Sequence, residues 1–237
     1  GEISEKLACS SAAGGLVVAA IGLVKQLTVE AAKRAALGAG AKVEYSYANF
    51  ITQDEIEEIK TSSIDIILLA GGTDGGNTES IIHNAKMLAE AKLDIPIVLA
   101  GNKMTYREIE KLFVDNNIYY QKAENVMPEI NVLNVESAKE KIRNIFIEKI
   151  TLAKGIKEAE KLVDNVIMPT PAAVLYGLEI LGHGTKNETG IGDLLCLDIG
   201  GATTDIHSIG KGLPSKAGVV FQGLEEPLAK LTLVLEP

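Results

Sequence analysis

The sequence has few cysteines and histidines, and these residues follow no pattern that builds a site. Cys9 and Cys196 each lie in an apolar segment without metal-ligand spacing, so we expect two small core residues and no disulfide framework. The three histidines, His83, His183 and His207, share no ligand spacing and therefore predict no metal site.

Long apolar runs and basic runs are also absent. The strongly apolar stretch at residues 16–24 is too short to cross a bilayer and has no cationic leader or export-type cleavage pattern, so we expect a cytoplasmic protein without a membrane segment. The chain carries 23 Lys+Arg against 32 Asp+Glu, a net charge of −9, which argues against nucleic acid as a partner.

What the sequence does contain is an alternating pattern that predicts an α/β fold. With 237 residues and 46% hydrophobic content, the chain is long enough for one large or two modest globular domains. Between residues 28 and 120, short aliphatic runs alternate with amphipathic stretches, as in a Rossmann-like parallel sheet with helical crossovers. The expected strands are residues 16–24, 42–47, 64–70, 95–100 and 118–121.

Helix starts in this region carry capping signals. Thr52 with Glu55, and Thr105 with Glu108, have the spacing of a capping box. Two further starts are expected, at Thr28 for a helix over residues 29–37, and at either Asn77 or Thr78.

The alternation of short strands and helices stops after Tyr120, and we expect a first region over residues 1–131 and a second over residues 132–237. The second region begins with helices at residues 134–154 and 156–163. A third helix starts with Thr170 as its cap and Pro171 as its first residue, and ends near Gly182. Residues 193–199 and 203–209 then predict a β-hairpin.

The turn of this hairpin, DIGGATTD, has the composition of a phosphate-binding turn. Gly200 and Gly201 let the backbone approach a ligand closely, and successive N–H groups in such a turn can hold phosphate oxygens. Asp198 and Asp205 can hold a hydrated Mg²⁺ or orient a water molecule. The alternative is a hairpin with a glycine bulge and two solvated aspartates.

This turn resembles the second phosphate motif of the actin-like ATPase superfamily, whose ribonuclease H-like fold is shared by actin, the Hsp70 chaperones, and sugar and acetate kinases. The superfamily pattern, Asp-x-Gly-Gly-x-Thr-x-Asp, matches at every fixed position. Ala202 stands where many members have a third glycine.

A resemblance over nearly the whole chain is carried by CSSAAGGL, AGGTDGGN, LNVESAKEKIRNIF, MPTPAAVL and DIGGATTDIHSI. Together these segments resemble the MutL family encoded beside glutamate mutase and related adenosylcobalamin-dependent aminomutases, which is unrelated to the mismatch-repair protein of that name. The resemblance implies an ATP-dependent reactivating chaperone that exchanges damaged cobalamin from mutase subunits, its partners.

The resemblance also implies roles for residues of the turn, with ATP and Mg²⁺ as cofactors. Asp198 and Asp205 would be catalytic, and Asp198 would hold Mg²⁺ through water. The phosphates would contact Gly200, Gly201, Ala202, Thr203 and Thr204.

Two motifs of the superfamily are missing from this chain, namely the first phosphate hairpin and the adenosine-binding Gly-Gly turn. We therefore expect a fragment of an actin-like ATPase that hydrolyses ATP poorly on its own, with the activity in the full-length protein. Homo-oligomer formation stays open.

A second glycine-rich turn, AGGTDGGN, follows an apolar strand and precedes a helix. This is where ligands of open α/β sheets tend to bind, which makes a ligand loop of Gly71, Gly72, Thr73, Asp74, Gly75, Gly76 and Asn77. A close-packed turn with Asp74 in solvent is the alternative.

Two other functions remain open from the sequence. One is a small-molecule kinase of the same superfamily, which would transfer a phosphoryl group to a hydroxyl or carboxylate. The other is a non-catalytic α/β interaction protein in which DIGGATTD is only a turn.

Overall fold

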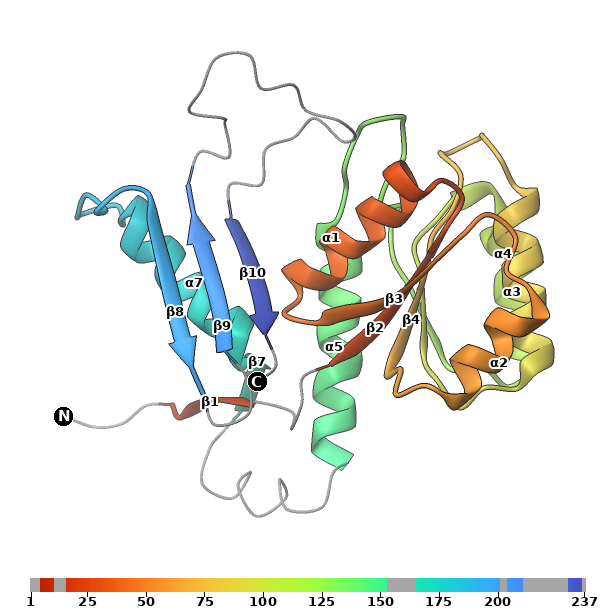
Figure 1. The fold of residues 1–237 in the computed structure, drawn as a ribbon, viewed down its shortest axis with the longest axis horizontal. Helices are drawn as coiled ribbons and strands as arrows, with labels where there is room; N and C mark the ends of the chain where they lie inside the picture. Colours follow the sequence, from red (N-terminus) through yellow and green to blue (C-terminus); the bar gives the residue numbers. More distant parts are fainter. Residues whose placement is uncertain (1–4, 11–15, 153–164, 201–203, 211–229, 236–237) are drawn as a thin grey trace.

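A five-stranded parallel sheet forms the centre of the larger part of the molecule (Figure 1). The computed structural model describes residues 5–10, 16–152, 165–200, 204–210 and 230–235. The sheet order is β3-β2-β4-β5-β6, so the chain starts inside the sheet, adds one neighbour on one side and then builds outward on the other. This doubly wound order confirms the predicted parallel α/β class. The strands are β2 (Val17–Gly22), β3 (Lys42–Ala48), β4 (Ile66–Leu69), β5 (Ile97–Leu99) and β6 (Tyr120–Lys122).

Helices cover both faces of this sheet and bury its three central strands, β2, β4 and β5 (Figure 1). One hydrophobic cluster joins the sheet to α1 (Glu30–Gly38) and α5 (Glu136–Leu152). The other joins the opposite face to α2 (Gln53–Thr61), α3 (Glu79–Ala91) and α4 (Tyr106–Asp115). All four residues of β4 are fully buried, as expected for a central strand that is covered on both faces.

The predicted helix starts have mixed outcomes. The Thr52 capping box is confirmed, because its hydroxyl accepts a hydrogen bond from Glu55 N–H at 3.3 Å and its own N–H donates to the Glu55 carboxylate at 2.7 Å. Of the two alternatives for α3, the capping side chain is Asn77, whose Oδ1 accepts from Ser80 N–H at 3.1 Å.

Thr28 and Thr105 do not cap helices, which corrects both predictions. A π-helical turn over Lys25–Val29 already encloses Thr28, and its hydroxyl instead accepts from Leu23 N–H at 2.8 Å. A 3₁₀ turn over Lys103–Thr105 likewise precedes α4, and the capping side chain is that of Asn102. In both places the first turn begins before the threonine, which therefore lies inside it.

A second group of elements lies beside the α1 and α5 face of the first (Figure 1). β1 (Leu7–Ser10) pairs in parallel with β7 (Asn165–Pro169), although more than 150 residues separate them in the chain. α7 (Thr170–His183) follows β7 directly and packs against β9 and β10. The remaining strands form an antiparallel sheet in the order β10-β9-β8, namely β8 (Leu194–Ile199), β9 (Thr204–Ile209) and β10 (Lys230–Leu235).

The strands β7 and β10 were not predicted, whereas the β8–β9 hairpin is confirmed within one residue. The short helix expected at residues 156–163 lies outside the described residues. α5 packs its Ala138, Ile142, Ile145 and Phe146 into the core of the parallel sheet. The division of the chain at residue 131 stays a prediction.

The two cysteines are free, but they are not core residues as expected. Cys9 is exposed and Cys196 is half-buried. Cys9 lies on β1, in a sheet of two described strands, β1 and β7. Cys196 lies on β8, on the half-buried face of that strand. None of the helices in the part of the chain that the structure describes is both long and apolar enough to cross a membrane.

Candidate functional site

The β8–β9 hairpin places the two aspartates of DIGGATTD directly opposite each other. Asp198 pairs with Asp205 in the antiparallel register, immediately before the turn. Residues that face each other across a hairpin project from the same side of the sheet, so both carboxylates lie on one face. Asp205 is buried, with 7% of its surface exposed, and Asp198 is half-buried.

The same face continues inward with Cys196 opposite His207. His207 is fully buried, and this burial lowers its pKa although the nearby carboxylates of Asp205 and Asp198 act to raise it. Burial thus favours the uncharged form of the imidazole.

The remaining residues of the turn are placed as follows. Gly200 is exposed at the end of β8. Thr204 pairs with Ile199, so its side chain projects from the face opposite to that of the two aspartates. Gly201, Ala202 and Thr203 lie outside the described residues.

The residues of β8 alternate between a half-buried face, which carries Asp198, and an exposed face. Leu195, Leu197 and Ile199 are each more than half exposed, whereas Leu194, Cys196 and Asp198 are half-buried toward α7. The period of two fixes which residues share the face of the aspartates, so the sequence pattern and the register agree.

The second candidate, AGGTDGGN, connects β4 to α3 at the carboxyl edge of the parallel sheet. The packing of the loop itself requires a glycine at position 72. Gly72 has a φ of +68°, and a Cβ at this position would lie 2.1 Å from the carbonyl oxygen of Asn77. Gly71 also has a positive φ, and a Cβ there would contact Ile81, whereas a Cβ on Gly75 would meet nothing within 4 Å.

Three successive N–H groups of this loop are already used inside the protein. Asp74 N–H donates to Pro128 O at 2.9 Å, Gly75 N–H to Asn102 Oδ1 at 3.1 Å and Gly76 N–H to Thr73 O at 2.9 Å. These groups do not offer an anion-binding cradle, and the remaining chemistry of the loop lies in the Asp74 side chain.

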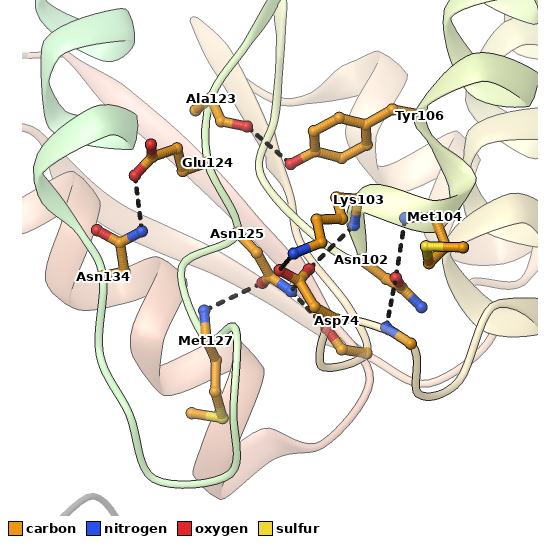
Figure 2. Close-up of polar contacts among 12 residues, drawn as sticks. Asp74, Asn102, Lys103, Met104, Tyr106, Ala123, Glu124, Asn125, Met127 and Asn134 are labelled. Atoms are coloured by element: carbon orange, nitrogen blue, oxygen red, sulfur yellow. Dashed lines mark hydrogen bonds and ion pairs between the residues drawn. The ribbon is translucent and has the colours of Figure 1, made fainter.

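Asp74 is held by three donors, two of them from the next strand end along the sheet (Figure 2). Its Oδ1 accepts from Lys103 N–H at 3.1 Å and from Asn125 Nδ2 at 3.0 Å, and its Oδ2 lies 3.1 Å from Lys103 Nζ. Burial acts to raise the pKa of Asp74, but these hydrogen bonds and the Lys103 charge outweigh it and lower the pKa. Asp74 is therefore not simply in solvent, as the close-packed alternative expected.

Two buried asparagines that the sequence analysis missed tie the loop to its neighbours (Figure 2). The Asn102 side chain accepts from Gly75 and Met104 N–H and donates to the carbonyls of Gly76 and Asn77. Asn125 Nδ2 donates to Gly72 O as well as to Asp74. For Asn102 the available signal was its position just after the apolar strand β5, whereas Asn125 follows the polar strand β6 and had no such signal.

Neither candidate forms a ready metal cluster. Within the described residues, no three His, Cys, Asp or Glu side chains gather closely enough to hold a metal ion. A hydrated Mg²⁺ needs one or two carboxylates, and the Asp198–Asp205 pair supplies that number.

Comparisons with known proteins identify relatives of the whole chain. A family model described as "MutL protein" matches residues 1–234. The curated Protein MutL of Clostridium tetanomorphum is 60% identical over 229 residues, which cover 97% of this chain and 50% of that protein. The chain thus spans about half the length of this relative. No solved structure matches the chain.

Proposed function

The chain belongs to the MutL protein family, and we propose that it supplies part of the nucleotide site of an ATP-dependent chaperone. Its partners would be subunits of an adenosylcobalamin-dependent mutase of the glutamate mutase type, which the chaperone reactivates by exchange of damaged cobalamin. The fold in this proposal is that of an actin-like ATPase.

The Asp198–Asp205 pair is the observation that carries this proposal. Like charges directly opposite each other destabilise a hairpin, and the burial of Asp205 adds to that cost. A divalent cation bound beside both carboxylates would reduce this repulsion, because Mg²⁺ in nucleotide sites is held by one or two carboxylates together with phosphate oxygens.

In this proposal some residues of the hairpin would bind the metal ion and others would bind the phosphates. Asp198 holds the hydrated Mg²⁺, and Asp205, opposite it, orients the water that attacks the γ-phosphate. Mg²⁺, when bound, neutralises charge that develops on the transferred phosphoryl group. Gly200 would contact the phosphates through its backbone, and so would Thr204, since its side chain projects from the other face.

Nucleotide hydrolysis would act on the mutase through movement. Binding and hydrolysis of ATP between two lobes shift their relative angle, and this shift changes the affinity for the mutase subunits. Since the chain spans about half the length of its relative, we assign turnover to the whole protein and expect little from these 237 residues alone.

The test is reactivation of an inactivated mutase by the full-length protein with ATP, Mg²⁺ and fresh cobalamin. We expect Asp198→Asn and Asp205→Asn to lower both ATP turnover and reactivation about 100-fold or more. Asp193→Asn is the matched control, because Asp193 is exposed just before β8 and faces no second carboxylate in the hairpin.

Two outcomes would replace this function by another one. A phosphorylated metabolite formed in place of free phosphate would identify a small-molecule kinase. Unchanged nucleotide binding in both hairpin variants would leave DIGGATTD as a turn in an interaction protein.

A further inference from the structure

A cavity of about 520 Å³ opens at the carboxyl ends of β4, β5 and β6. It is distinct from the hairpin, since none of its lining residues belongs to β8 or β9. Each of the three strand ends contributes to it, with Asp74 after β4, Lys103 after β5 and the segment from Lys122 to Asn125 at β6. Ligands of open parallel sheets bind at this edge, and the volume suits a small organic molecule.

The acidic groups of the cavity are held by donors within the protein. Asp74 accepts from Asn125 and from both the backbone and the ammonium of Lys103. Glu124 accepts from Asn134 Nδ2 at 2.9 Å (Figure 2). Neither carboxylate therefore needs a cation from a ligand.

The basic groups keep donors to spare. Lys103 Nζ lies 3.1 Å from Asp74, and Lys122 Nζ lies 2.8 Å from Glu110. An ammonium group has three N–H donors, so each lysine can serve an additional acceptor. Both side chains are at least half exposed, which lets their ends move toward a ligand.

A hydroxyl donor and an apolar wall complete the lining. Ser137 Oγ accepts a hydrogen bond from Glu124 N–H at 3.1 Å, which leaves its own hydrogen free to donate. The Tyr106 ring is fixed by its hydroxyl, which donates to Ala123 O at 2.7 Å (Figure 2). The ring, Ala123 and Pro128 offer apolar surface beside these donors.

We propose that this cavity binds a small organic anion, whose phosphate or carboxylate group is held by Lys103, Lys122 and Ser137 and whose body lies against Tyr106. Both lysines are ion-paired, but they and Ser137 keep N–H and O–H donors beyond those that their partners use, so a ligand that supplies acceptor oxygens, an anion, is complementary. This site goes beyond the proposed nucleotide site and does not depend on it.

The test is titration of the chain with two probes, AMP for a phosphate ligand and 4-hydroxybenzoate for a carboxylate ligand, by calorimetry and by amide NMR shifts at Ala123 and Ser137. We expect at least one probe to bind saturably. Each of Lys103→Ala and Lys122→Ala should weaken its binding about tenfold, the loss of one charged hydrogen bond. Which of the two probes binds shows whether the site prefers a phosphate or a carboxylate group.

Lys86→Ala is the matched control, because Lys86 is a half-exposed lysine with an acidic partner, Glu108, and does not line the cavity. The proposal is overturned if neither probe saturates, or if both cavity variants bind as the Lys86 variant does. Asp198→Asn separates the two sites: probe binding that survives it belongs to the cavity, and probe binding that it abolishes belongs to the hairpin and also overturns the proposal.

Discussion

Asp198 stands directly across the β8–β9 hairpin from Asp205, so two carboxylates share one face at the mouth of a glycine turn. A hairpin selected for stability alone would pair one of them with a cation or a neutral residue. We therefore expect the stability of the free protein and its proposed function to respond in opposite directions to the same substitution.

We predict that Asp198→Asn stabilises the nucleotide-free chain. Removing one of two opposed like charges should raise the free energy of unfolding by about 0.5 kcal/mol. Urea denaturation in the absence of Mg²⁺ measures this effect, with Asp193→Asn as the control that should leave stability unchanged. A clear loss of stability in Asp198→Asn would show that the carboxylate is favourable in the free protein.

Asn102→Ala should be strongly destabilising, although the residue is small and lies in a loop. Its fully buried amide takes part in four hydrogen bonds with loop backbone. The substitution removes the partner of these backbone groups, which should lower the free energy of unfolding by about 3 kcal/mol. Chemical denaturation measures the change. Asn187→Ala, in an exposed turn, serves as the control, and an equal effect in both would contradict this role of Asn102.

The glycines of AGGTDGGN should differ in their tolerance of alanine. Both Gly72 and Gly75 have a positive φ, which alone costs an alanine about 1 kcal/mol. At Gly72 the new Cβ would also overlap the carbonyl of Asn77, so Gly72→Ala should cost about 2 kcal/mol more than Gly75→Ala. Thermal unfolding of the two variants compares them directly, and equal losses would rule out the close contact as the reason for Gly72.

Asp74 should make the stability of the protein depend on acid pH. Its pKa is lowered in the folded state, so its contribution is present above the unfolded pKa of about 3.9 and is lost as the pH falls through the folded value. Denaturation at a series of pH values below about 4 should show a smaller loss of stability in Asp74→Asn than in the wild type. Parallel curves for the two proteins would mean that Asp74 is not stabilised by Lys103 and Asn125.

The parallel sheet was predictable because its signals are local. The strands β2, β4 and β5 are short apolar runs, and the Thr52 capping box involves residues only three apart. The hairpin was predictable for the same reason, since its period of two and its glycine turn fix the register that brings Asp198 to Asp205.

Features that depend on distant residues were not predictable in this way. No pattern in the four residues of β1 identifies β7, more than 150 residues further along the chain, as its partner. Asn125 bonds to Gly72, 53 residues earlier, so its role follows from the order of the strands. The predicted caps at Thr28 and Thr105 were wrong because the first helical turn begins before each threonine, earlier than the capping pattern indicates.

The parallel pairing of β1 with β7 changes how the larger sheet is regarded. Two parallel strands need a crossover of about a dozen residues or more, usually one helix. Here the chain that makes this crossover contains the whole five-stranded sheet with its five helices, residues 17–152. In topological terms the α/β unit is an insertion between the two strands of this pair. A single crossover helix between β1 and β7 would satisfy the same parallel pairing.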